Sequence, residues 1–169
     1  MSGQIESGWI EPTRALPLRW GTYIGRYLAG LGLIVSGTIA LAGGNATFGL
    51  PLVLGILAHV VGWWIMPAAG WRRIWVVLPS LLCVLILLIG PGGVGLLAVP
   101  FAGWLLVRHR PLVTFALALV VLGAGVVLRE VNAEQSGMLP AMAVMAAVIV
   151  ACAWIARAAS SRLFHRQSR

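Results

Sequence analysis

The sequence predicts an all-α fold, a polytopic transmembrane helix bundle with six helices. Three observations lead to this fold class. Of the 169 residues, 60% are hydrophobic and 9% are charged, whereas soluble domains carry about 25% charged residues. The apolar residues form six runs separated by short polar or glycine-rich breaks. When these runs cross the membrane in alternating directions, eleven of the twelve arginines fall on one side of it.

The composition also limits the expected partners. The chain has four glutamates and no lysine or aspartate, and its formal net charge is +8. We expect no nucleic-acid partner, because a chain built mostly of apolar runs lacks the polar scaffold that positions base-contacting side chains. Membrane lipids are the expected partner of this charge. Arginine without lysine, beside abundant alanine, glycine and leucine, is typical of a GC-rich genome and favours a bacterial source.

The chain is predicted to have three parts. Residues 1–22 mix charged residues, prolines and tryptophans, which is typical of a cytoplasmic or interfacial segment. Residues 23–157 form the six-helix transmembrane domain, and residues 158–169 form a basic cytoplasmic tail. The six apolar runs are expected at residues 23–42, 47–66, 74–89, 94–107, 112–128 and 138–156.

The runs differ in length. A helix needs about 20 apolar residues to cross the hydrocarbon core, and the first, second and sixth runs meet this requirement. The third and fourth runs are shorter. We favour two full but short spans for them, and the alternative is a re-entrant pair, which is tolerated only where neighbouring helices bury it.

The arginines predict an orientation in which both termini are cytoplasmic. Six crossings then leave Arg129 as the one arginine outside. The tryptophans support this orientation, because they cluster near the predicted cytoplasmic face of the membrane and none lies near the outer face. This one-sided belt contains Trp63, Trp64, Trp71, Trp75, Trp104 and Trp154. The expected location is the bacterial inner membrane, and five arginines are expected at lipid headgroups or as topology signals: Arg72, Arg73, Arg108, Arg110 and Arg157.

His59 is the candidate for a functional residue within the membrane. It lies near the middle of the second run, with Trp63 one turn further on. Ionisable groups inside a membrane are costly and suggest function, so these two residues are predicted to line a pathway or bind a ligand. The alternative is a neutral imidazole that is hydrogen-bonded to a neighbouring helix.

Small residues mark two candidate packing faces. Such faces let helix backbones approach closely in lipid. We expect packing within the chain first, and packing against another subunit or a second copy as the alternative. The faces contain Ala29, Gly32, Ser36 and Ala40 in the first run and Ala143, Ala147 and Ala151 in the sixth.

The sequence argues against an enzyme. Membrane hydrolases and proteases need paired carboxylates, a serine with a base, or metal ligands at one depth. The spans contain no carboxylate, and no shared spacing connects His59 with the hydroxyl residues Ser36, Thr38, Ser80 and Thr114. No metal site and no cofactor is expected.

These observations predict an integral membrane protein without catalytic machinery. The favoured function is a small subunit or accessory component of a membrane complex, of transport type. The partners are then other membrane protein subunits or further copies of the chain. The alternative is a self-contained, oligomeric transporter or channel in which His59 lines the path.

Overall fold

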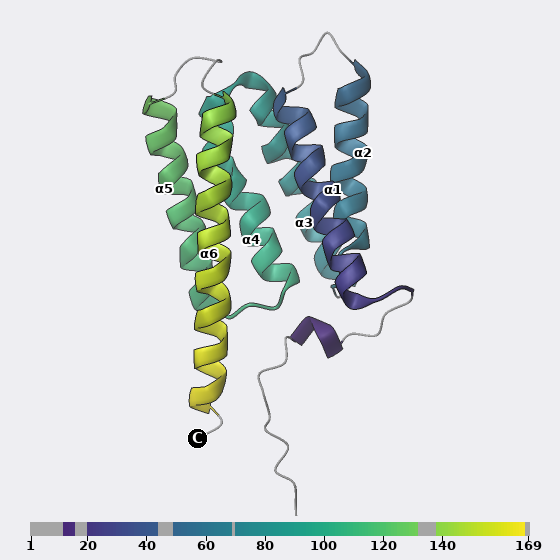
Figure 1. The fold of residues 1–169 in the computed structure, drawn as a ribbon, viewed down its shortest axis with the longest axis vertical. Coiled ribbons are helices and arrows are strands. Elements are labelled where there is room, and N and C mark those ends of the chain that lie inside the picture. Colours follow the sequence, from purple (N-terminus) through teal and green to yellow (C-terminus); the bar gives the residue numbers. More distant parts are fainter. Residues whose placement is uncertain (1–11, 16–19, 44–48, 69, 132–137, 168–169) are drawn as a thin grey trace, which may run out of the picture.

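Nearly all of the described part of the chain is helical. A computed structural model describes residues 12–15, 20–43, 49–68, 70–131 and 138–167. Within these ranges every regular element is a helix, and the α-helices lie side by side (Figure 1). The all-α fold predicted from the sequence is confirmed. Most of the predicted N-terminal segment 1–22, the loop 132–137 and the last two residues of the tail lie outside the described residues.

Each of the six apolar runs forms an α-helix, and short 3-10 helices accompany them. The α-helices are α1 (Tyr23–Gly43), α2 (Gly49–Ile65), α3 (Gly70–Leu85), α4 (Ala98–Val107), α5 (Ala116–Val131) and α6 (Met138–Gln167). The 3-10 helices are η1 (Pro12–Ala15), η2 (Ile86–Ile89), η3 (Pro91–Leu97) and η4 (Leu112–Phe115). Because η2 continues α3, η3 leads into α4 and η4 leads into α5, these runs are longer than their α-helical parts.

Four helical stretches are long and apolar enough to cross a membrane, so the chain has the helices of a membrane-embedded protein. They are Tyr23–Ala42, Trp71–Ile89, Leu112–Val131 and Leu139–Leu163. The other two runs form shorter apolar helices, Gly49–Ile65 and Gly92–Val107.

Two of the expected lengths are corrected. The third run, expected at 74–89, covers 19 residues, Trp71–Ile89, because its helix already begins at Gly70 and so includes the arginine pair. The reason for expecting a re-entrant third segment therefore no longer applies. The second run, expected at 47–66, forms a 17-residue helix, Gly49–Ile65. Pro67 disfavours helical backbone in Met66, the residue before it, and residues 47–48 lie outside the described ranges. At 1.5 Å per residue this helix measures about 26 Å, near the lower limit for a span.

The helices alternate in direction along the bundle. α1 packs along α2, α3 packs against α4, and α5 packs against η3 and α6. Figure 1 shows the beginning of α1 and the C-terminal end of α6 at the same end of the bundle. α6 continues without a break through residue 158, where the sequence analysis begins a separate tail.

Two pairs of glycines bring α1 and α2 together. Gly30 faces Gly62 and Gly37 faces Gly55, and the two glycines on each helix are seven residues apart. A Cβ at Gly37 would lie 2.7 Å from the Gly55 carbonyl oxygen and 2.7 Å from the backbone nitrogen of His59. No larger residue fits there, and close backbone approach is how helices associate in lipid. These four glycines, the glycine seam, place the middle of α2 directly against α1.

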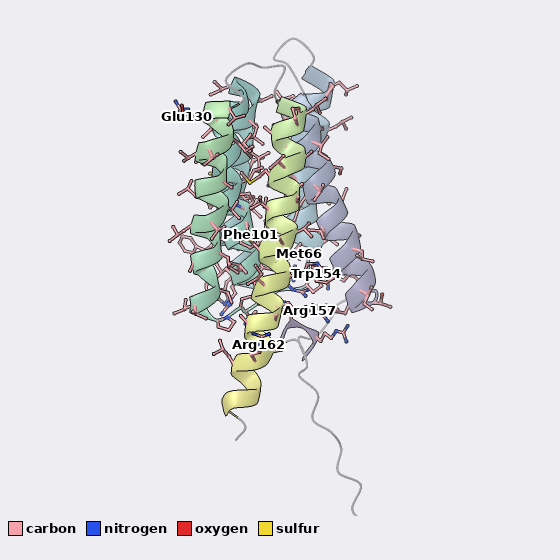
Figure 2. All side chains as sticks on the ribbon, turned by 60° about the vertical axis from the view of Figure 1, so that its left-hand side comes forward. Met66, Phe101, Glu130, Trp154, Arg157 and Arg162 are labelled. Carbon is pink, nitrogen blue, oxygen red and sulfur yellow. The ribbon has the colours of Figure 1, made fainter. Side chains whose placement is uncertain are left out.

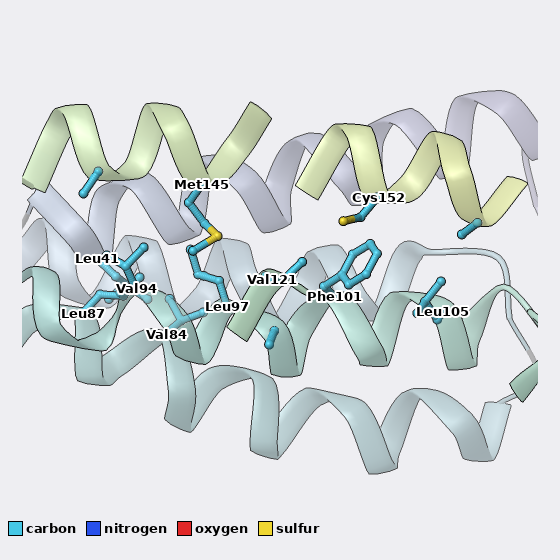
Figure 3. Close-up of a cluster of buried hydrophobic side chains, with 13 residues drawn as sticks. Leu41, Val84, Leu87, Val94, Leu97, Phe101, Leu105, Val121, Met145 and Cys152 are labelled. Carbon is cyan, nitrogen blue, oxygen red and sulfur yellow. The ribbon is translucent and has the colours of Figure 1, made fainter. Parts of the chain in front are cut away.

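The larger apolar core lies between η3, α4, α5 and α6 and is bounded by Leu41 of α1 and Val84 of α3. Figure 3 shows Met145 of α6 beside Leu97 of η3 and Cys152 of α6 beside Phe101 of α4. η3 and α5 approach so closely that a Cβ at Gly125 would collide with the Gly95 backbone. The close approach of the two glycine backbones and the fit of the apolar side chains therefore determine how these helices pack.

A smaller apolar core lies between α1, α2, α3 and α4. It contains buried side chains from each of these helices and from the turn after α2: Ile34, Trp63, Met66, Ala68, Val76 and Val107. The outer surfaces carry large apolar side chains that are exposed, as the projecting side chains in Figure 2 illustrate. A surface of this kind suits a lipid solvent.

Candidate functional site

A buried polar network surrounds His59. The Nδ1 atom of His59 lies 3.3 Å from Oγ1 of Thr38 on α1, and its Nε2 atom lies 2.9 Å from Oγ of Ser80 on α3. Trp63 donates from its indole nitrogen to His59 Nε2 at 3.2 Å and to Ser80 Oγ at 3.1 Å. His59 and Ser80 are 0% exposed, Trp63 1% and Thr38 9%. We call these four side chains the polar network, and they join three helices.

The donors assign the proton on the His59 ring. The indole N–H of Trp63 only donates, so Nε2 accepts and the ring proton lies on Nδ1. Nδ1 then donates to Thr38, whose hydroxyl donates to the carbonyl oxygen of Ile34 at 2.8 Å. The Ser80 hydroxyl donates to Nε2 and accepts from Trp63. Both ring nitrogens of a neutral imidazole are therefore satisfied, as buried polar groups generally are.

Sequence reasoning found His59 and Trp63 but missed their partners. Thr38 and Ser80, expected to be scattered, each lie 21 residues from His59 and reach its ring from either side. This expectation is corrected, because antiparallel helices bring residues together by depth in the membrane and not by sequence spacing. The other two hydroxyls stay apart, since Ser36 bonds the carbonyl oxygen of Leu33 and Thr114 that of Pro111.

Ser80 and His59 have the spacing of a nucleophile and its base. A hydroxyl within about 3.2 Å of an imidazole is the first requirement for such chemistry. The second is a place for the reacting atom of a substrate next to the hydroxyl. Both side chains are fully buried, and the Trp63 indole already donates a hydrogen bond to the Ser80 hydroxyl. These contacts occupy the position next to the hydroxyl where a substrate atom would have to lie. The geometry is that of an internal hydrogen-bond network joining three helices.

A second concentration of polar side chains lies at one end of the bundle. We call it the arginine end, and it contains Arg26, Arg72, Arg73, Arg108 and Arg110. Figure 2 shows Arg157 and Arg162 of α6 toward this end and Glu130 of α5 at the opposite end. Arg157 and Arg162 are exposed.

Two arginines hold the C-terminal end of α2. The Nε atom of Arg26 donates to the carbonyl oxygen of Ile65 at 3.1 Å. Arg73 donates to the carbonyl oxygens of Trp64 at 2.8 Å and Ala68 at 2.6 Å. The last carbonyls of a helix lack partners within the helix and attract cations. Arg73, expected to contact lipid headgroups, therefore also caps a helix, and sequence analysis did not single out Arg26 for this role.

Arg72 caps the C-terminal end of α4 in the same way. Its Nη1 atom donates to the carbonyl oxygen of Leu106 at 2.9 Å. The neighbouring His109 lies in the connection to η4, outside the spanning segments. Burial, and then the positive charge of Arg72, lowers the pKa of His109 below its usual 6.5. The electrostatic field at this corner of the bundle is thus positive.

Arg108 and Arg110 pack on aromatic rings. The Arg108 guanidinium carbon lies 4.3 Å from the centre of the Tyr27 ring and 5.7 Å from that of Trp104. Arg108 also donates to the hydroxyl of Tyr23 at 2.6 Å, and Arg110 lies 5.9 Å from the Trp104 ring. Cation–π contacts of this kind stabilise more strongly where water is excluded. Both arginines are more than nine-tenths buried, so their guanidinium groups lie inside the end of the bundle.

Most of the tryptophans in the expected belt are exposed, but Trp63 is not. Trp64, Trp71, Trp75 and Trp154 expose between 59% and 77% of their surface, and Trp104 is partly buried. Trp63 belongs to the polar network instead, because its indole nitrogen points at His59 and Ser80. The predicted belt is therefore corrected at this one residue.

Most residues of the predicted packing faces point away from the rest of the chain. On α1, Ala40 is partly buried, whereas Ala29, Gly32 and Ser36 are exposed. On α6, Ala143, Ala147 and Ala151 are exposed, and the residues in the core are Ala141, Met145, Cys152 and Ala156. Of the predicted face on α1, only Ala40 packs within the chain, because its Cβ would lie 3.3 Å from a Cβ built at Gly55 of α2. The closest approach of α1 to α2 is made instead by Gly30 and Gly37.

Within the described ranges, no three histidine, cysteine, aspartate or glutamate side chains come close enough to hold a metal ion. The two cysteines are free thiols, with Cys152 buried in the larger core and Cys83 partly buried on α3. Comparisons with known proteins agree on one point: no family model, no curated protein and no solved structure matches the chain.

Proposed function

We propose that the chain is a non-catalytic integral membrane protein that acts as a small subunit or accessory component of a membrane complex, of transport type. The observation that carries this proposal is the exposure of two small-residue faces, one on α1 and one on α6. The chain's own helices are already packed through other residues, so these faces remain for a partner. The partner is another membrane protein subunit or a second copy of the chain.

Each face offers close backbone approach. A Cβ at Gly32 would have no heavy atom of the chain within 4 Å, and the three alanines of α6 recur every four residues on its outer side. In Figure 1 α1 and α6 both lie toward the viewer, with α3 and α4 behind them. Small residues at such positions allow a partner helix to pack against the backbone, which strengthens association in lipid.

The proposal includes an orientation and a location. The described arginines gather at the arginine end and on the end of α6 nearest to it, while Arg129 lies beside Glu130 in α5. The positive-inside rule then favours an arginine end that faces the cytoplasm, with both termini on that side. The arginine-rich, lysine-free composition favours a bacterial inner membrane.

The second candidate is an oligomeric transporter or channel whose path passes His59 and Trp63. It is supported by the rarity of ionisable side chains deep in a span. The polar network argues against it, because both ring nitrogens of His59 are bonded to neighbouring helices and the ring is fully buried. These contacts suit a residue that joins helices better than one that lines a path.

Native mass spectrometry of the tagged protein, gently extracted from its own membrane, tests the proposal. A subunit is expected to appear in a stable complex with another protein, whereas a homo-oligomer without any other protein would favour the second candidate. Gly32→Leu and Ala147→Leu are expected to disrupt that complex, because leucine fills the approach of the partner helix. A monomer that is unaffected by either substitution would overturn the proposal.

The chain provides matched controls. Gly123 is also exposed and has no heavy atom within 4 Å of a built Cβ, and Ala116 is exposed at the beginning of α5. Gly123→Leu and Ala116→Leu introduce the same side chain on another helix and are expected to leave the complex intact. His59→Ala tests the second candidate. If His59 lines a transport path, this variant should change flux and leave the complex intact.

A further inference from the structure

The corner between α3 and α4 brings one arginine and one histidine to the same carbonyl oxygen. The oxygen of Leu106 accepts from Arg72 Nη1 at 2.9 Å and from the backbone nitrogen of His109 at 3.1 Å. His109 has a φ of 54°, in the left-handed region that few residues other than glycine adopt. The turn after α4 therefore folds tightly over the helix end and holds His109 beside the Arg72 guanidinium.

Two side-chain nitrogen atoms at this corner can each form a further hydrogen bond. Arg72 Nε and His109 Nε2 are buried, and neither has a hydrogen-bond partner among the described residues. A buried donor without an acceptor carries a cost in stability. Because Nη1 of Arg72 is already bonded to Leu106, the remaining edge of its guanidinium and the imidazole are available to an acceptor with several oxygens.

The charge at the corner favours an anion as that acceptor. The turn carries Arg108 and Arg110 on either side of His109, and both are buried against the Trp104 ring. Glu130 is the acidic side chain among the described residues, and it lies at the opposite end of the bundle (Figure 2). Burial, and then the charge of Arg72, lowers the pKa of His109, and an anion bound beside both groups would favour the protonated, hydrogen-bond-donating imidazole.

We propose that this corner binds one phosphate-class anion, which is contacted by Arg72 and His109 and lies in the positive field of Arg108 and Arg110. The planar guanidinium matches the oxygens of a phosphate, and its charge-assisted hydrogen bonds are stronger than neutral ones. The phosphate belongs either to the headgroup of an anionic lipid or to a free phosphate. This site is independent of the proposed docking role of α1 and α6.

The test uses the full chain in nanodiscs of phosphatidylcholine with and without phosphatidylglycerol. Native mass spectrometry counts the phosphatidylglycerol molecules that stay bound, and NMR of the imidazole of His109 reports local binding. We expect Arg72→Gln and His109→Gln each to weaken retention roughly tenfold, in line with the loss of one charge-assisted contact. Arg162→Gln, an exposed arginine of α6, is the control and should retain lipid like the natural chain.

A second arm separates the two sources of phosphate. Inorganic phosphate is titrated into nanodiscs of phosphatidylcholine alone, and a saturable shift at His109 would assign the site to a free phosphate. Retention of phosphatidylglycerol without that shift would assign it to a lipid headgroup. Absence of both, or an equal loss of lipid with Arg162→Gln, would overturn the proposal. His109→Gln leaves the Arg72 bond to Leu106 in place and so separates a binding defect from a folding defect.

Discussion

The two halves of the bundle are held together in different ways. Between α1, α2 and α3, the contacts include the polar network of four side chains and the glycine seam. Between η3, α4, α5 and α6, the buried side chains of the larger core are apolar or, at Cys152, a thiol. Figure 3 shows this second interface as interlocking leucine, valine, phenylalanine and methionine side chains.

The difference indicates how each half specifies its arrangement. Apolar contacts in lipid do not discriminate strongly between one helix rotation and another, because the surrounding solvent is equally apolar. Hydrogen bonds to His59 from α1 and α3 are directional and define both the rotation and the depth of three helices. In the other half, close approach at Gly95 and Gly125 and the shapes of the core side chains must provide the same information.

The largest expected effect breaks the glycine seam. Gly37→Leu places a side chain where a Cβ alone would lie 2.7 Å from the carbonyl oxygen of Gly55. We expect the free energy of unfolding, measured in mixed detergent micelles, to fall by about 3 kcal/mol or more. Gly32→Leu, on the open side of the same helix, should not lower it, because the side chain meets no atom of the chain and leucine favours a helix more than glycine does. Equal losses from the two variants would contradict the assigned packing face.

The corresponding test of the other half compares two glycines of α5. Gly125→Ala forces a methyl group into the backbone of Gly95, and we expect a loss of about 2 kcal/mol. Gly123→Ala meets open space and should stabilise the helix by about 0.5–1 kcal/mol, because alanine restricts the unfolded chain. The two changes are thus expected to have opposite signs in the same unfolding assay.

Two substitutions that keep the side-chain volume similar compare the polar network with the larger apolar core. His59→Leu removes the hydrogen bonds to Thr38 and Ser80 and leaves the Trp63 indole with one acceptor. We expect a loss of about 2 kcal/mol, since single bonds between helices in membranes contribute about 0.6 kcal/mol on average and the network contains several. Met145→Leu in the apolar core should cost less than about 1.5 kcal/mol. If Met145→Leu cost more than His59→Leu, the network would not be the stronger restraint.

The smallest expected effect concerns His109 at the arginine end, where the two halves meet. Burial is the main cause of its lowered pKa, and the charge of Arg72 is the second. Arg72→Gln removes the repulsion between two positive charges, so protonation becomes easier and the pKa is expected to rise part of the way toward 6.5. NMR titration of the imidazole would measure the change. Arg162→Gln should leave the pKa unchanged, and a decrease with Arg72→Gln would contradict the electrostatic assignment.

Hydropathy predicted the helices well but not their lengths. All six apolar runs form helices, because a lipid-embedded backbone must satisfy its polar groups internally. The third run differs from the expected length at its beginning, because α3 starts at Gly70, ahead of the arginine pair. The second run is shorter because α2 covers Gly49–Ile65. Such end effects depend on single residues that a hydropathy average does not distinguish.

The candidate site was predicted in part. An isolated histidine in an apolar run is visible in any sequence, and so is the tryptophan one turn away. Thr38 and Ser80 were not assigned to the site because each lies on a different helix, and their contact with His59 depends on how α1 and α3 are placed beside α2. The capping role of Arg26 was missed for the same reason, since its acceptor lies 39 residues away.

Composition and hydropathy are enough to predict a bundle of apolar helices with its arginines concentrated toward one end. This is possible because the length of an apolar run and the position of a charge relative to that run are local properties. Which face of each helix points inward follows instead from how the helices pack. Gly30 and Gly37 meet α2, while Gly32 on the same helix stays exposed. In water an apolar stripe marks the buried face of a helix, but in lipid both faces are apolar, so rotation is decided by contacts between helices.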